Sequence, residues 1–127
     1  MAQSRPPTLT LVIVEDEPLI RIELADVLSD MGYAVLEASN ADAAIRYLET
    51  RPEIVAVITD LSMPGSLDGL ALARIVRERW PPCALIMLSG HRRPAEAESP
   101  TGMRFLPKPV ASRSLERTLG ELGVGIV

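Results

Sequence analysis

Four short apolar runs in this chain each end at polar residues that could take part in chemistry. These residues are Glu15 and Asp16 after the first run, Asp60 after the second, Ser89 after the third, and Lys108 shortly after the fourth. A charged group directly after a buried strand is costly unless it is used. If the runs are neighbouring strands of one parallel sheet, their carboxyl ends meet at one edge, where α/β proteins bind ligands.

The acidic residues of this set predict a site for a divalent cation. Glu15, Asp16 and Asp60 would bring three carboxylates together, and like charges repel unless a proton or a cation lies between them. An incomplete set of oxygen ligands leaves positions for water and a phosphoryl oxygen, which suits Mg²⁺ better than Ca²⁺. We expect Asp16 and Asp60 to share the ion, with Glu15 acting through a water or from outside the ligand shell. The backbone carbonyl of Ser62 could supply a further oxygen.

Lys108 and Ser89 complete a set of groups suited to phosphoryl transfer. A carboxylate can act as the nucleophile, a cation can bridge the moving charge, and an ammonium and a hydroxyl can hold the remaining oxygens. Asp60 is the expected acceptor, because its position at the end of the central strand lets Asp16 share the metal from the neighbouring strand.

The elements that position these residues follow a βα pattern. Aliphatic runs alternate with longer amphipathic stretches, which predicts an α/β fold: a five-stranded, doubly wound parallel sheet with helices on both faces. The expected strands are 9–14, 34–37, 54–59, 84–88 and 103–106. Helices are expected to begin near Pro18, Asn40 and Asp68, and a last helix to place Leu115, Leu119 and Leu122 on one side.

Two segments do not fit this regular alternation. Residues 91–101 contain Pro94 and Pro100 and few large apolar groups, so a fourth helix there should be short or irregular. Residues 1–7 are expected to form a disordered extension ahead of the first strand.

Length and composition exclude several classes of protein. The 127 residues carry a net charge of −4 and match a single domain, 1–127. The scattered basic residues offer no stripe for nucleic acid, and no apolar stretch is long enough to span a membrane. The single cysteine, Cys83, leads into an apolar strand and is expected to be a buried thiol. These features favour a cytoplasmic protein without direct nucleic-acid or membrane contacts.

The motifs together resemble the receiver domain of response regulators, the chemotaxis-receiver-like family of two-component signalling. Nearly the whole chain takes part in the resemblance. The matching motifs are Glu15-Asp16, Asp60 with Met63-Pro64 and Asp68-Gly69, Ser89, Phe105, and Lys108-Pro109. The resemblance implies a flavodoxin-like sheet with strand order 2-1-3-4-5, an order known from a member of this family.

The resemblance also implies a mechanism and partners. Asp60 would be phosphorylated, with Mg²⁺ required, from a phosphohistidine on a sensor histidine kinase or a histidine phosphotransfer protein. Ser89 would then turn toward the phosphoryl group while Phe105 moves inward, switching a surface that binds an unknown downstream protein. The chain would catalyse only its own phosphorylation and dephosphorylation. The Lys108-Pro109 peptide bond would be cis, as is usual in this family.

Some residues depart from the family pattern. The turn 64–69 is one residue longer than the commonest form, which should change the shape of the loop at the edge of the site beside Asp60. Gly90 stands where alanine is usual and loosens the backbone behind Ser89. The abbreviated segment 91–101 puts the usual output surface and the usual dimer in question.

Three alternative functions can be weighed against a stand-alone receiver with no output domain, which is the reading that the chain length favours. The runner-up is a receiver-like scaffold that works without phosphorylation, although a scaffold has no need for clustered carboxylates. A dehalogenase-like phosphatase would need a second aspartate two residues after Asp60, where Ser62 stands. Dinucleotide binding fails because the turn 14–18 lacks glycines.

Overall fold

The structure is a computed structural model that describes residues 8–63, 65, 67–90 and 99–126. Within these residues five parallel strands form one sheet in the order β2-β1-β3-β4-β5. The strands are β1 (Thr10–Val14), β2 (Ala34–Ala38), β3 (Ile54–Asp60), β4 (Ala84–Ser89) and β5 (Arg104–Pro107). The described helices are α1 (Pro18–Asp30), α2 (Ala41–Thr50), α3 (Gly69–Arg79) and α4 (Ser112–Glu121).

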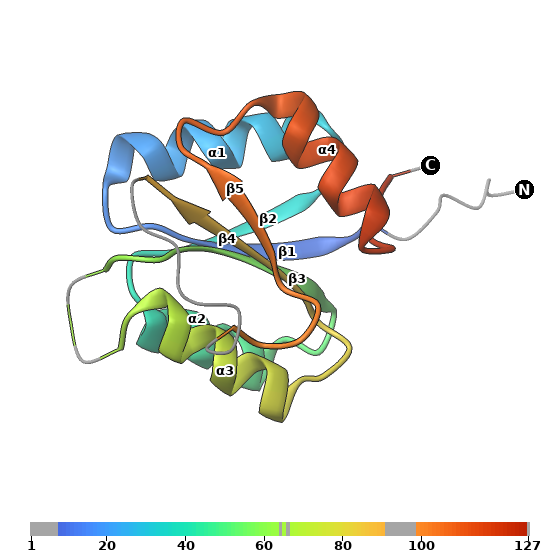
Figure 1. Cartoon of the computed structure of the whole chain (residues 1–127). Coiled ribbons are helices and arrows are strands. Elements are labelled where there is room, and N and C mark those ends of the chain that lie inside the picture. Colours follow the sequence, from blue (N-terminus) through green and yellow to red (C-terminus); the bar gives the residue numbers. More distant parts are fainter. Residues whose placement is uncertain (1–7, 64, 66, 91–98, 127) are drawn as a thin grey trace, which may run out of the picture.

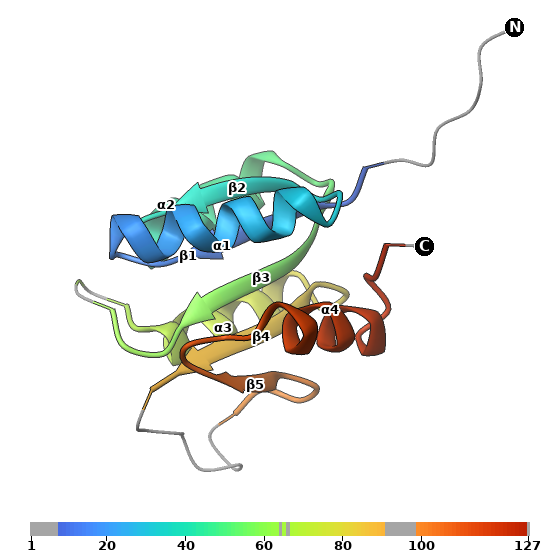
Figure 2. The same ribbon diagram turned by 90° about the horizontal axis from the view of Figure 1, so that it is seen from above.

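The helices cover both faces of the sheet, as expected for a doubly wound fold. Helices α1 and α4 lie on one face and α2 and α3 on the other (Figure 1). Seen from above, α1 lies beside β1 and β2, and α4 lies beside β4 and β5 (Figure 2). The predicted fold and strand order are therefore confirmed.

Local sequence signals explain where the helices begin and end. The side chain of Asn40 accepts a hydrogen bond from the Ala43 amide at 2.8 Å, which caps α2, and Asp68 caps α3 through the Ala71 amide at 2.8 Å. Both contacts satisfy an amide that has no partner within its helix. Gly32 follows α1 with a φ of 108°, a conformation that glycine adopts readily.

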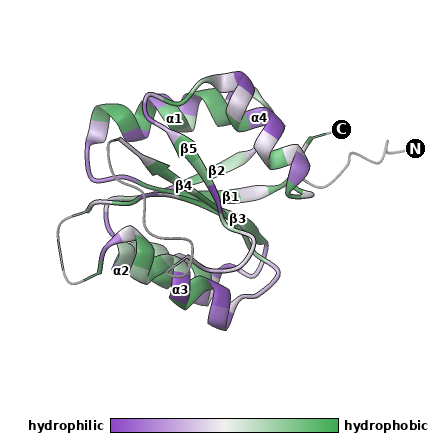
Figure 3. Ribbon diagram, viewed as in Figure 1, coloured by the Kyte–Doolittle hydropathy of each residue, from purple (hydrophilic) through white to green (hydrophobic). Residues whose placement is uncertain are grey.

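The core consists of two apolar layers, one on each face of the sheet. The layer under α1 and α4 includes Leu11, Ile58, Ile86 and Leu119, and all four are fully buried. The layer under α2 and α3 includes Val57, Leu72, Val76, Leu85 and Met87, which are likewise fully buried. In Figure 3 the central strands β3 and β4, which lie between the two layers, are drawn in the green of hydrophobic residues. A sheet packed on both faces holds the ends of its strands in fixed relative positions.

The predicted elements can be compared with those observed. β1 to β4 each differ from the predicted range by one residue at one end, with β3 extending to Asp60 and β4 to Ser89, and β5 is shifted by one residue. The predicted cis bond between Lys108 and Pro109 is present. The predictions for residues 91–98 and 1–7 fall outside the residues that the structure describes.

Candidate functional site

The predicted site residues meet at the carboxyl edge of the sheet. Asp60 is the last residue of β3 and Ser89 the last of β4, while Glu15 directly follows β1 and Lys108 directly follows β5. The loops that leave these strands gather on the left in Figure 1. Four strands thus each contribute one polar group to the same place, as expected for neighbouring parallel strands.

Three carboxylates cluster at this edge. Glu15, Asp16 and Asp60 each offer an oxygen, and the three atoms lie within 4.8 Å of one another. The residues Glu15 and Asp60 are only 2% and 6% exposed, whereas Asp16 is open to solvent. The cluster is therefore half-enclosed, with a side from which an ion and water can enter.

Lys108 is the cation of this cluster, and it is the only lysine in the chain. Its Nζ lies 2.5 Å from Oδ1 of Asp60 and 3.2 Å from Oε1 of Glu15. The Lys108 amide donates to the Ser89 carbonyl at 3.0 Å, which fixes the start of the loop after β5. Partial burial lowers the pKa of Lys108, but hydrogen bonds and charge from Asp60 and then Glu15 outweigh it and raise the pKa overall.

Glu15 is held at several atoms by the protein itself. Its amide donates to the Ala38 carbonyl at 3.0 Å, and its Oε2 accepts from the Glu17 amide at 3.2 Å. Because Oε1 is paired with Lys108, both carboxylate oxygens have protein partners. This arrangement supports the expectation that Glu15 acts from outside the ligand shell of an ion.

A pocket opens beside Asp60. It has a volume of about 290 Å³ and is lined by Asp60, Leu61, Ser62, Leu88, Ser89, Gly90 and Lys108. Ser62 and Gly90 are exposed, while Ser89 is buried. The pocket brings the predicted acceptor, the hydroxyl and the ammonium around one space large enough for a phosphoryl group.

Gly69 closes the turn behind Asp60 by a close backbone approach. Its amide donates to the Leu61 carbonyl at 2.9 Å. A Cβ atom at this position would collide with the backbone carbonyl oxygen of Asp60. The Asp68-Gly69 pair is therefore structural: Asp68 caps α3, and Gly69 lets the first residue of α3 rest against the acceptor strand.

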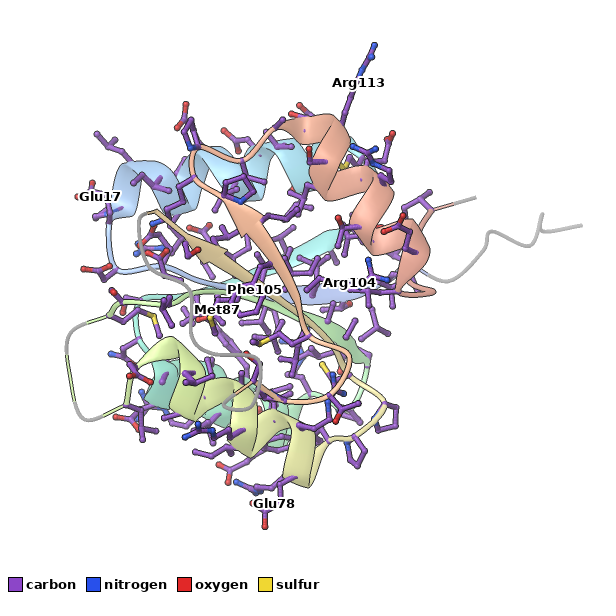
Figure 4. The ribbon with its side chains drawn as sticks, in the orientation of Figure 1. Glu17, Glu78, Met87, Arg104, Phe105 and Arg113 are labelled. Carbon is purple, nitrogen blue, oxygen red and sulfur yellow. The ribbon has the colours of Figure 1, made fainter. Side chains whose placement is uncertain are left out.

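Phe105, the predicted switch residue, lies on β5 beside β4. It is the register partner of Met87 on β4 and is partly buried, packing against the apolar layer under α2 and α3 (Figure 4). Only one residue separates Met87 from Ser89 on the same strand. Phe105 is thus the strand partner of a residue two positions from Ser89.

Arg21 was not predicted from the sequence, although it reaches the site from the first turns of α1. Its Nη1 donates to the Glu15 carbonyl at 3.0 Å, and its Nε donates to Oε1 of Glu37 on β2 at 3.2 Å. In the sequence, an arginine on the polar face of a helix indicates an exposed, solvated side chain. The one available signal is its position, six residues after Glu15, which places it one turn into the helix that follows.

The donor set fits Mg²⁺. The cluster consists of carboxylate oxygens, which Mg²⁺ prefers, and the described residues around it include no sulfur or imidazole ligand. The cluster holds three carboxylates and one ammonium, which pairs with Glu15 and Asp60, so it has an excess of negative charge for a cation to offset. One of the carboxylates, Asp16, is exposed, which leaves access for the waters that Mg²⁺ usually retains.

The fold and the site together define a doubly wound α/β domain with a cluster of carboxylates and one lysine at the carboxyl edge of its sheet. The family model described as "Response regulator receiver domain" matches residues 11–119. The chain therefore belongs to the response regulator receiver domain family, whose members act in two-component signalling. Among the described residues, no helix has the length and apolar character needed to cross a membrane.

Individual relatives agree with this assignment. The chain is 40% identical over 116 residues to the positive alginate biosynthesis regulatory protein of Pseudomonas aeruginosa, covering 87% of this chain and 46% of that protein. It is 33% identical over 117 residues to the sensor kinase CckA of Brucella abortus, covering 89% of this chain and 12% of that protein. The chain thus spans less than half the length of these curated relatives.

Solved structures show the same fold. A response regulator receiver protein from Sinorhizobium medicae superposes with a TM-score of 0.83 at 27% sequence identity. The superposition covers 91% of this chain and 94% of that one.

Proposed function

We propose that Asp60 accepts a phosphoryl group from a phosphohistidine on a sensor histidine kinase or a histidine phosphotransfer protein. The observation that carries this proposal is the arrangement around Asp60: a buried carboxylate paired with the only lysine, beside two further carboxylates. A structural ion pair between Lys108 and Asp60 would not account for the additional carboxylate of Asp16. Asp16 is exposed, so it is not there to pack against the core.

The transfer step can be written with this chain's residues. A carboxylate oxygen of Asp60 attacks the phosphorus and forms an acyl phosphate, while the bond between phosphorus and the imidazole nitrogen breaks. The electron pair of that bond stays on the imidazole, which takes up a proton from solvent. Lys108, already within contact distance of Asp60, offsets the charge on the transferred oxygens, and Ser89 offers its hydroxyl to one of them.

Mg²⁺ fits the carboxylate cluster and, when bound, supplies a positive charge shared by the acceptor and the phosphoryl oxygens. We assign Asp16 and Asp60 as its side-chain ligands and the Ser62 carbonyl as a further oxygen. Glu15 supports the ion from outside, because its two oxygens are taken up by Lys108 and the Glu17 amide.

Phosphorylation would act as a switch rather than as turnover of an external substrate. The new group brings charge and acceptor oxygens to Ser89, and Phe105 can respond because its strand partner Met87 is two residues from Ser89. Two side-chain movements can bias a two-state surface, which a downstream protein then reads. The only reactions assigned to the chain are therefore its own phosphorylation and dephosphorylation.

A groove beside the site supports docking of a protein donor. It has a volume of about 530 Å³ and is lined by Ile20, Glu23, Leu24, Val27, Leu88, Gly90, Lys108, Pro109 and Val110. The groove shares Leu88, Gly90 and Lys108 with the pocket at Asp60. A donor that rests on this apolar surface would therefore be next to the acceptor, and we assign the groove to the phosphohistidine-bearing protein.

Intact-protein mass spectrometry after incubation with phosphoramidate, with and without Mg²⁺, tests the proposal. Phosphoramidate carries the same phosphorus–nitrogen bond as phosphohistidine. The native chain should gain a single phosphoryl adduct that requires Mg²⁺, and Asp60→Asn should gain none. Asp68→Asn is the matched control, because Asp68 is an exposed aspartate in the same turn, and this variant should still react. A folded native chain that forms no adduct would favour the scaffold that works without phosphorylation.

A further inference from the structure

Arg21 links the start of α1 to the main chain of the acidic loop. We propose that Arg21 is a positioning residue for the Mg²⁺ site: by binding the Glu15 carbonyl, it holds Asp16 beside Asp60. This inference rests on the proposed function of the carboxylate cluster and deepens it by naming a residue that would set its affinity for the ion.

The contacts of Arg21 leave its guanidinium little freedom. Nη1 donates to the Glu15 carbonyl at 3.0 Å, and Nε donates to Oε1 of Glu37 at 3.2 Å. The side chain of Arg21 is 19% exposed and that of Glu37 is 40% exposed. Two contacts made by one rigid, planar group fix its orientation better than either contact alone. Glu37 thus holds the guanidinium in place, and the guanidinium in turn holds Glu15.

The Glu15 carbonyl influences the position of Asp16, because it belongs to the peptide unit that joins the two residues. A peptide unit is planar, so holding its oxygen also fixes the direction in which the next Cα lies. The preceding peptide is held by the hydrogen bond from the Glu15 amide to the Ala38 carbonyl. β1 ends at Val14, and the sheet ladder therefore no longer restrains Asp16. Arg21 supplies a restraint where the sheet stops.

Such a restraint is needed because the carboxylates repel one another. Glu15, Asp16 and Asp60 place oxygens within 4.8 Å, and Asp16 is the exposed member of the three. Without the Arg21 contact, repulsion can turn the loop so that Asp16 moves into solvent, away from Asp60. The ion would then have to draw the loop back, and this reorganisation would weaken its binding.

Electrostatics alone predicts the opposite change in Mg²⁺ affinity when Arg21 is removed. Arg21 is a cation near a cation site, so its removal should strengthen Mg²⁺ binding if charge is all that it contributes. If Arg21 positions Asp16, its removal should weaken Mg²⁺ binding. The direction of the change in affinity therefore separates the two roles.

Isothermal titration of the full chain with Mg²⁺, without any phosphoryl donor, measures this direction. Arg21→Met removes both donors and keeps the apolar stem, and we expect it to raise the Kd for Mg²⁺ by about tenfold, the lower end for groups that orient metal ligands. Arg21→Lys should recover part of the affinity, since one ammonium can reach the Glu15 carbonyl but cannot bridge to Glu37. Arg51→Met is the matched control, because the Arg51–Glu53 pair is also made through Nε and is exposed. It should leave the Kd unchanged.

A double-mutant cycle separates positioning from general stability. In an Asp16→Asn background, Arg21→Met should no longer weaken Mg²⁺ binding, because the charged ligand that Arg21 positions is gone and only the electrostatic effect of its charge remains. If Arg21→Met does not fold, Glu37→Gln, which weakens the hold on the guanidinium, replaces it in the cycle.

Three results would overturn the inference: an unchanged or lower Kd in Arg21→Met, an equal rise in Arg51→Met, or a rise in Kd on Arg21→Met that persists in the Asp16→Asn background. A native chain that binds no Mg²⁺ overturns the proposed function itself, and the inference with it. That result is distinguishable, because it appears before any variant is made.

Discussion

The Nζ of Lys108 lies 2.5 Å from Oδ1 of Asp60, and this pair ties the end of β5 to the end of β3. The second partner of Lys108, Glu15, adds the end of β1 at 3.2 Å. One ammonium therefore connects three strands that are not all neighbours in the sheet. Since it is the only lysine of the chain, its chemistry can be followed without interference from others.

Replacing Lys108 should separate its effect on phosphoryl transfer from its effect on the ion. Lys108→Gln removes the charge that would stabilise the transferred oxygens, so the rate of phosphorylation by phosphoramidate at saturating Mg²⁺ should fall by about a hundredfold. Removing a cation from the carboxylate cluster should at the same time lower the Kd for Mg²⁺. Adduct formation followed over time, together with titration of Mg²⁺, measures both. An unchanged rate would show that Lys108 has only a structural role.

The pKa of Lys108 leads to a prediction for alkaline pH. The pKa is raised above the ordinary value of 10.5 by Asp60 and Glu15, although burial opposes the shift. The folded state therefore keeps this proton after the unfolded chain has lost it. The stabilisation should be complete below pH 10.5 and should be lost as pH rises from there through the folded pKa. In ¹³C NMR of the metal-free chain labelled at lysine Cε, the single lysine signal should titrate above 10.5.

Denaturant unfolding at a series of pH values supplies the matching stability measurement. Tyr33 and Cys83 also have raised pKa values, mainly through burial, and contribute a loss of stability in the same direction. The difference between the native chain and Lys108→Gln isolates Lys108. That difference should shrink above pH 10.5, and a constant difference would contradict the assignment.

Gly69→Ala should destabilise the chain because the new Cβ would collide with the Asp60 carbonyl oxygen. We expect a loss of about 1–3 kcal/mol in the free energy of unfolding, which is the usual range for overpacking a buried position. Gly120→Ala is the matched control, since a Cβ at Gly120 in α4 meets nothing within 4 Å. This control should gain up to about 1 kcal/mol from the helix propensity of alanine. Equal stability of the two variants would contradict the close approach at Gly69.

Cys83 should be inert in the folded chain. Burial raises the pKa of its thiol to about 11, although the charge of Arg77 acts in the opposite direction. Little thiolate is then present near neutral pH, and the sulfur is enclosed, so a disulfide reagent such as Ellman's reagent should react only after unfolding. A chain carrying Cys83→Ala and Ser29→Cys presents an exposed thiol on α1 and should react at once. Rapid reaction of the native folded chain would contradict the burial of Cys83.

The sequence predicted the elements well because the apolar runs are short and clearly bounded. The observed strands β3 and β4 each include one residue more than predicted, Asp60 and Ser89. Both residues are polar, so a pattern of apolar residues stops one position too early. The ladder continues, and the Leu61 amide beyond Asp60 still donates to the Leu88 carbonyl at 3.0 Å. Ile20, on the first turn of α1, is 37% exposed and lines the groove beside the site.

The site was predicted as a set of residues but not as a set of contacts. Strand ends placed Glu15, Asp60 and Lys108 together, since parallel strands end at the same edge. Periodicity could not show that Lys108 would pair with both carboxylates, because that depends on the path of the loop after β5. It could not show the reach of Arg21 either, since a bond to a backbone carbonyl has no signature in the partner's residue type.

Borohydride reduction of the phosphorylated chain tests most directly that Asp60 is the acceptor. An acyl phosphate on aspartate is reduced to homoserine, and tandem mass spectrometry of the digested chain locates the converted residue. After treatment with phosphoramidate and Mg²⁺, conversion should occur at position 60 alone, and it should disappear when either reagent is left out. Conversion at Asp16 or Asp68, or an adduct that resists reduction, would contradict the account.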